Sequence, residues 1–66
     1  MNDEDYYTIE AMSQYGGSFV TSLANLARFA DPNNLYKIKM TWSEYWAEYE
    51  KMGKELKTKR NKNGEQ

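Results

Sequence analysis

Apolar residues recur at helical spacing in three stretches of this chain, and two short polar breaks separate them. The first break is Gly16-Gly17, and the second is Asp31-Pro32-Asn33-Asn34. Both combinations interrupt regular structure. Apolar positions three and four residues apart are typical of amphipathic helices. The pattern therefore predicts an all-α protein, a small three-helix domain with a short extra helical turn.

The first stretch, residues 3–15, has the features of a helix with a weak apolar face. Acidic residues stand at its start, where the helix dipole favours them, and Gly16 follows its end. Its apolar positions Tyr6, Ile9 and Met12 form only a narrow stripe. We expect a helix here whose packing is the least well defined of the three.

The second stretch has the clearest pattern of a core helix. Ser18 is a suitable N-cap residue, and Gly17 before it is small enough to let two helices approach closely. The apolar residues that follow at helical spacing are Phe19, Val20, Leu23, Leu26, Ala27 and Ala30. Asp31 is a second N-cap candidate, because Pro32 is favoured at the first position of a new helix.

Residues 35–40 carry two conflicting signals. Tyr36, Ile38 and Met40 alternate with two lysines, which is the pattern of a strand. No other segment offers a matching strand, and a lone strand would leave its backbone groups without partners. We therefore expect a short helical turn near Leu35, with a strand as the alternative.

The last stretch predicts a strongly amphipathic helix. Thr41 and Glu44 match a capping box, and Ser43 is an alternative cap. Six apolar residues fall within about 120° of one another around the helix axis. They are Trp42, Tyr45, Trp46, Tyr49, Met52 and Leu56.

Together these patterns predict a core and a boundary. The expected core residues are Phe19, Leu23, Leu26, Ile38, Trp42, Trp46 and Tyr49. Residues 1–57 form the expected helical domain. Residues 58–66 contain no apolar side chain, so we expect a disordered basic tail.

Composition excludes several kinds of chemistry. The chain has no Cys and no His, which rules out disulfides, the usual zinc ligands and the ordinary Ser-His and Cys-His pairs of nucleophilic catalysis. No calcium-loop pattern is present. We expect no enzyme activity, cofactor or metal. The acidic N-terminus and the lack of a long apolar run predict neither an export signal nor a membrane span.

Charge is distributed unevenly along the chain, although the net charge is only −1. Through Tyr36, one cation faces five acids, a balance of −4; from Lys37 on, eight cations face five acids, a balance of +3. The basic tail could contact nucleic-acid phosphates through Lys57, Lys59, Arg60 and Lys62. A solvated end that aids solubility is the favoured alternative.

Ten aromatic residues are more than a 66-residue chain is expected to bury. Exposed Tyr and Trp side chains are enriched at the centres of protein interfaces. We therefore expect part of the last helix to bind a partner while the rest forms core. The candidate partner-binding residues are Trp42, Tyr45, Tyr49 and Met52.

Three pieces of the sequence carry a resemblance. Residues 15–20 are Tyr-Gly-Gly-Ser-Phe-Val, residues 30–34 are Ala-Asp-Pro-Asn-Asn, and residues 45–49 match Tyr-Trp-x-x-Tyr. In this order the pieces resemble a group of short open reading frames from tailed bacteriophages. The resemblance covers residues 12–49. It implies a phage origin and a compact helical fold, and it transfers no activity and no functional residue.

These observations favour a binding protein. We expect a small phage accessory protein that acts stoichiometrically on a host or phage protein, as an inhibitor or adaptor, in the cytoplasm of the infected bacterium. Self-association is possible within this hypothesis. The alternatives are a nucleic-acid-associated factor that uses the basic tail and a minor structural component of the virion.

Overall fold

The computed structural model describes the backbone of residues 1–64 and the side chains of residues 1–60, and this part of the chain is built of helices without a strand. The four helices are α1 (Asp3–Tyr15), α2 (Ser18–Arg28), α3 (Pro32–Thr41) and α4 (Ser43–Gly64). The all-α prediction is confirmed. The predicted count of three is wrong, because the expected short turn is a helix of 10 residues.

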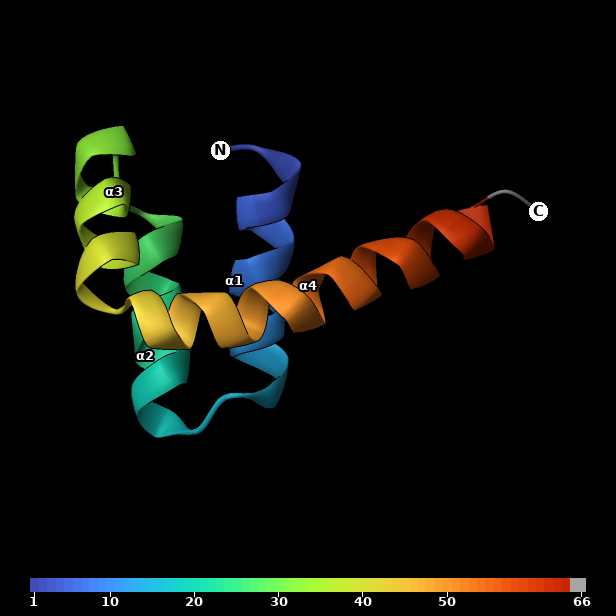
Figure 1. Ribbon diagram of the computed structural model, residues 1–66, viewed down its shortest axis with the longest axis horizontal. Helices are drawn as coiled ribbons and strands as arrows, with labels where there is room; N and C mark the ends of the chain where they lie inside the picture. The colour runs from blue at the N-terminus through green and yellow to red at the C-terminus, as the bar shows by residue number, and fades with distance from the viewer. Residues whose placement is uncertain (65–66) are drawn as a thin grey trace.

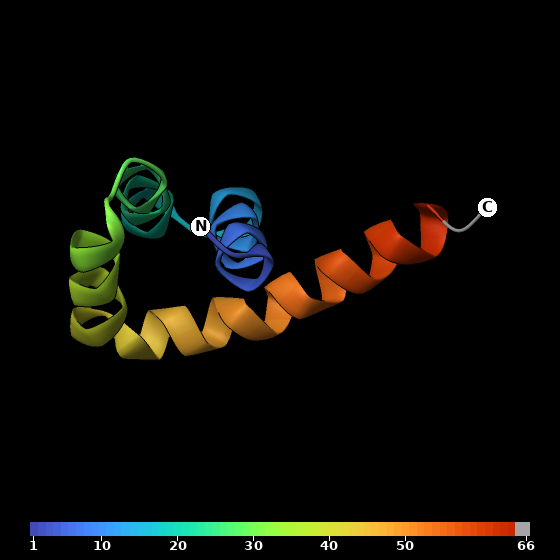
Figure 2. The same cartoon turned by 90° about the horizontal axis from the view of Figure 1, so that it is seen from above.

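The longest helix, α4, crosses the first two helices of the chain (Figure 1). Figure 1 shows α4 running along the long axis of the molecule and crossing α1 and α2, while α3 lies at one end. Figure 2 shows α1 and α2 side by side, with α4 along one side of both. The C-terminal part of α4 extends beyond α1, so the molecule is elongated, at 38 × 24 × 17 Å.

Side-chain capping explains where two of the helices, α1 and α3, begin. Asn2 caps α1 by accepting a hydrogen bond from the backbone N–H of Asp5 at 2.8 Å. Asp31 caps α3 in the same way, accepting from the N–H of Asn34 at 3.1 Å, as the sequence predicts. At α2 the prediction is wrong: Gly17 is the cap residue, Ser18 is already helical, and no side chain caps the helix.

The junction between α3 and α4 also differs from the prediction. Thr41 is the last residue of α3 and does not cap α4, which begins at Ser43. Trp42 connects the two helices: its N–H donates to the Ile38 carbonyl at 2.9 Å, and its own carbonyl accepts from Trp46 N–H at 2.9 Å. The chain therefore turns at Trp42 without a loop.

The core lies where α1 is enclosed by α2 and α4. Its buried apolar residues are Ile9, Ala11, Met12, Val20, Leu23, Ala24, Ala27, Leu35, Ile38, Trp46 and Tyr49. The expectation that Leu23, Ile38, Trp46 and Tyr49 are core is confirmed. The helix with the weakest predicted stripe, α1, supplies the centre, since Ile9 and Met12 are fully buried.

Three residues predicted to be core are instead exposed on the surface. Phe19 is 51%, Leu26 60% and Trp42 37% exposed. On α2, the buried face consists of Val20, Leu23, Ala24 and Ala27, and Phe19 and Leu26 lie on the other side of the helix. Tyr6, expected on the inner stripe of α1, is also largely exposed.

Close helix contact occurs at glycines other than the expected one. A Cβ atom at Gly17 would meet nothing within 4 Å, so Gly17 is not a contact point. A Cβ at Gly53 would lie 2.8 Å from the backbone of Tyr7 and Thr8, and one at Gly16 would lie 2.5 Å from Val20 Cγ1 of α2. Gly53 is therefore the site where α1 and α4 cross most closely.

The predicted boundary between domain and tail, after residue 57, lies within helix α4. The helix continues beyond Lys57 to Gly64, so residues 58–64 extend the last helix and do not leave the fold at the predicted boundary. The side chains of residues 61–64 and the whole of residues 65–66 lie outside the described part of the structure.

Candidate functional site

Three aromatic rings from three different helical segments meet on the surface, and we name Phe19, Trp42 and Tyr45 the aromatic cluster. The Phe19 ring lies edge-on to Trp42 at 5.0 Å between centroids and 69° between planes. Tyr45 completes the group, 5.7 Å from Phe19 and 6.3 Å from Trp42. Such geometry stabilises each pair by about 0.5–1.5 kcal/mol.

The positions of these rings follow from the backbone beneath them. Phe19 stands in the first turn of α2, Trp42 at the junction of α3 and α4, and Tyr45 in the first turn of α4. Helix termini hold all three, and the two backbone hydrogen bonds of Trp42 fix the junction. The cluster is thus organised before any partner binds.

The aromatic cluster remains open to solvent although its rings contact one another. Tyr45 is 38% exposed, close to the value for Trp42, and Phe19 is exposed by about half. Large aromatic side chains that are both ordered and accessible are the type enriched at binding hot spots. The cluster can therefore contact another molecule without rearrangement of the fold.

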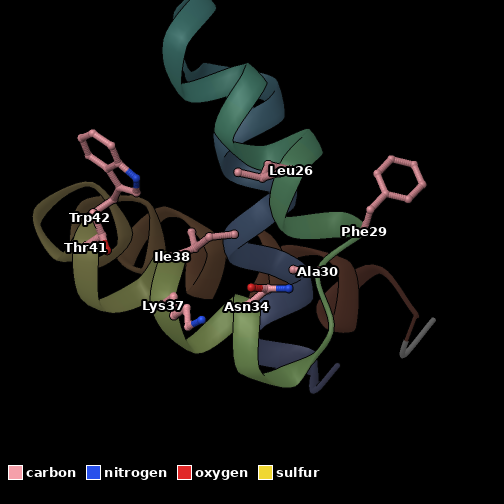
Figure 3. Close-up of a pocket in the computed structure, with 8 residues that line it drawn as sticks. All are labelled: Leu26, Phe29, Ala30, Asn34, Lys37, Ile38, Thr41 and Trp42. Carbon is pink, nitrogen blue, oxygen red and sulfur yellow. The ribbon is translucent and has the colours of Figure 1, made fainter.

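An apolar groove runs beside the cluster between α2 and α3, with a volume of about 300 Å³. Leu26 and Ile38 lie on its two sides, and Trp42 forms the end nearest the cluster (Figure 3). Phe29, just after α2, is 88% exposed and projects outward at the other end (Figure 3). Lys37 is the only charged residue that lines the groove among the described side chains.

The predicted partner-binding residues do not all lie on one surface. Trp42 and Tyr45 lie together in the aromatic cluster. Tyr49, which the sequence offers both as core and as a candidate contact, is buried in the core. Met52 is partly buried and packs against the core on the side of Tyr15, away from the cluster.

Sequence reasoning missed the contribution of α2 to this surface. The sequence predicts Phe19 and Leu26 as core and gives Phe29 no role, whereas all three side chains are exposed. The available signal was the presence of large apolar residues on two sides of one helix, which is more than one buried face can hold.

Two of the predicted nucleic-acid residues, Lys57 and Arg60, contact helix α1. Lys57 Nζ lies 3.8 Å from Asp3 Oδ2, and the Arg60 guanidinium stands over the Tyr7 ring at 5.4 Å. Hydrogen bonding to the hydroxyl of Tyr6, and then to that of Tyr7, raises the pKa of Arg60 above its usual value. Lys59 is exposed and lines one hollow with Arg60 and another with Tyr15. The side chain of Lys62 lies outside the described residues.

One half-buried ion pair lies away from these surfaces. Lys39 Nζ of α3 contacts both carboxylate oxygens of Asp5 at 3.0 and 3.3 Å, and Asp5 is buried in the first turn of α1. The same ammonium lies 5.5 Å from the Trp46 ring centroid, and the buried Trp46 Nε1 has no hydrogen-bond partner among the described residues. This arrangement joins α1, α3 and α4.

Two further observations concern the described residues as a whole. No three acidic, His or Cys side chains come together there in an arrangement that could hold a metal ion. None of the described helices combines the length and apolar character needed to cross a bilayer.

The arrangement defines a small four-helix protein with an exposed aromatic cluster beside an apolar groove. Comparison with protein-family models, with curated proteins and with solved structures finds no match to this chain.

Proposed function

We propose that this protein acts by stoichiometric binding to another protein, and that the aromatic cluster with the adjoining groove is its contact surface. The observation that carries this proposal is the packing of Phe19, Trp42 and Tyr45 from three helical segments into one ordered group that remains exposed. Burial stabilises a large aromatic side chain, so the exposure of all three rings calls for a functional explanation.

The chemistry of the surface supports protein as the ligand. Trp and Tyr combine a large apolar area with a polar edge, and their few rotatable bonds limit the entropy lost on binding. The groove beside them can take an apolar anchor side chain, and Lys37 at its edge can pair with an acidic group. A binding surface of this composition suits a helix or loop of a partner.

The resemblance to short phage open reading frames supports a setting for this activity. In that setting the chain is an accessory protein that inhibits or adapts a host or phage protein in the cytoplasm of the infected bacterium. The rival use of the basic tail on nucleic acid has less support, because Lys57 and Arg60 face α1. A minor role in the virion remains the other alternative.

The proposal is tested by affinity capture from lysate of infected cells with matched variants of the immobilised chain. Phe19→Ala and Tyr45→Ala remove parts of the cluster that are already 51% and 38% exposed. Tyr36→Ala is the control, because this exposed tyrosine lies in a different hollow beside Lys39. A protein captured by the wild type and by the Tyr36 variant, but lost from both cluster variants, is the expected result. Capture that is equal for all four chains contradicts the proposal.

A further inference from the structure

Helix α2 is apolar on two separate faces, and only one of them is buried within the chain. The inner face consists of Val20, Leu23, Ala24 and Ala27, all buried. The outer face consists of Phe19 and Leu26 and continues with Phe29, the residue that follows the helix; all three are exposed, and Ser22 completes the spacing i, i+3, i+7, i+10. This spacing is the seam pattern by which one helix packs against another. A helix that is apolar on both sides is normally covered on both sides.

The outer face carries no charge that would oppose pairing with an identical face. The only charged residue of α2 is Arg28. Its guanidinium is held against α1, 3.1 Å from Glu10 Oε1 and 3.0 Å from Ser13 Oγ. The chain as a whole has a net charge of −1, so the repulsion between two copies is small.

Large and small residues follow one another along the outer face of α2 in an order that makes this face complementary to itself when two copies are antiparallel. When two copies of α2 are placed antiparallel about a two-fold axis near residue 24, position 19 faces position 29 and position 22 faces position 26. Each Leu26 then lies over the small Ser22 of the second copy. Each projecting Phe29 reaches the aromatic cluster of the second copy, because residues 19 and 29 are about 15 Å apart along the helix.

We infer that, in the free protein, this outer face is covered by the same face of a second copy of the chain, with the two α2 helices antiparallel. The inference rests on the proposed function, since it names what occupies the binding surface when no other partner is present. An isologous contact of this kind uses one patch twice and closes at two copies. Another protein that binds the aromatic cluster would then compete with the dimer.

The area available is of the size that such a contact requires. A large aromatic or aliphatic side chain exposes up to roughly 150–250 Å². With the observed exposures, Phe19, Leu26, Phe29, Trp42 and Tyr45 together present on the order of 500 Å². A standard interface buries about 800 Å² on each partner. These five side chains thus supply more than half of a standard interface before any rim residue is counted, and a reversible dimer is expected.

Sedimentation equilibrium of the purified chain tests the inference, over concentrations from about 10 µM to about 1 mM, where a reversible dimer of this size dissociates. Phe29→Ala removes a side chain that contacts little within its own chain, and Ser22→Lys places bulk and charge at the small position of the seam. Each is expected to raise the dimer dissociation constant at least about tenfold. Tyr36→Ala and Thr58→Lys are the matched controls on other surfaces, and both are expected to behave as wild type.

The orientation is tested separately, because the chain has no cysteine of its own. An oxidised mixture of Ser22→Cys and Leu26→Cys chains is expected to give the mixed disulfide in preference to either homodimer. A preference for Ser22→Cys homodimers would indicate parallel helices and overturn the arrangement.

The outcomes separate this inference from the proposed function. A wild-type chain that is monomeric at every concentration overturns the inference, and loss of a captured protein from the cluster variants would still support the proposed function. A dimer that neither Phe29→Ala nor Ser22→Lys weakens also overturns it. A dimer that both variants weaken supports it, even where no other protein is captured.

Discussion

Gly53 of α4 lies directly against the backbone of Thr8 in α1, so closely that a Cβ atom at Gly53 would stand 2.8 Å from the Thr8 nitrogen. Thr8 is buried, and its hydroxyl donates to the Glu4 carbonyl at 2.8 Å, which satisfies it within α1. The contact therefore joins backbone to backbone, with no side chain between the helices. This close approach explains how α1, which has few large apolar residues, becomes the centre of the core.

Gly53→Ala is expected to destabilise the protein, although Ala is the better helix former. In an open helical position the change would stabilise by up to about 1 kcal/mol. Here the added methyl group meets backbone that cannot move aside, and overpacking of this kind costs about 1–3 kcal/mol. Thermal unfolding measures the result. Gly17→Ala is the control, since its Cβ meets nothing within 4 Å, and a Gly53 variant at least as stable as wild type would contradict the close crossing.

The charge of Lys39 is expected to stabilise the fold through Asp5. Lys39→Met keeps the aliphatic stem beside Trp46 and leaves the buried Asp5 carboxylate without its ion-pair partner. A loss of about 1–2 kcal/mol in the free energy of unfolding is expected, less than for a fully buried pair because the Lys39 side chain is 36% exposed. Denaturant titration of Lys39→Met, Asp5→Asn and the double variant gives the coupling. Strictly additive losses would show that the pair contributes nothing.

The sequence predicts the helices better than it predicts which side of each helix is buried. The limits of α1 agree with the prediction because acids, Gly16 and apolar spacing act locally. Its central position does not follow from hydrophobicity, since it depends on Gly53 some forty residues later in the sequence. Residues 35–40 are helical because Asp31 and Pro32 start a helix and Lys39 reaches Asp5, which the strand-like alternation conceals.

Half of the candidate site follows from the sequence and half does not. Trp42 and Tyr45 were selected by their residue types and their place on the amphipathic helix. Phe19 and Leu26 were assigned to the core because helical spacing locates apolar positions without saying which of two faces turns inward. On α2 that choice depends on how closely α1 can approach, and small residues such as Ala24 permit the closest approach.

Binding of DNA through the basic residues is expected to be weak and sensitive to salt. Lys57 and Arg60 already face α1, so few cations remain to displace counterions from phosphates. Any binding should be lost between about 50 and 200 mM salt, because its salt dependence rises with each phosphate contact. Fluorescence anisotropy with a labelled duplex measures this. Sequence-specific binding that persists at physiological salt would favour the nucleic-acid alternative.

The end of α4 is expected to contribute only a little to stability, and unevenly along its length. Deleting residues 57–66 removes the contacts of Lys57 with Asp3 and of Arg60 with Tyr7, whereas deleting residues 61–66 removes neither. The longer deletion should lower Tm by a few degrees and the shorter one by less, since exposed pairs contribute about 0–1 kcal/mol. Equal Tm values for the two truncated chains would show that these contacts add no measurable stability.

Substitutions at two neighbouring residues of α4 are expected to affect different properties, folding at Trp46 and binding at Tyr45. Trp46 is 4% exposed and packs in the core, whereas Tyr45 belongs to the aromatic cluster on the surface. Trp46→Ala should cost about 3–5 kcal/mol and unfold a domain of this size, because it leaves a large cavity where α3 and α4 meet. Tyr45→Ala should retain the helical circular dichroism spectrum and weaken association by more than about 1 kcal/mol. Trp46→Phe is the intermediate case, since it keeps an aromatic ring and removes the buried Nε1 donor that has no partner among the described residues. A folded Trp46→Ala chain, or collapse of the Tyr45→Ala chain, would show that the inner and outer faces of α4 are reversed.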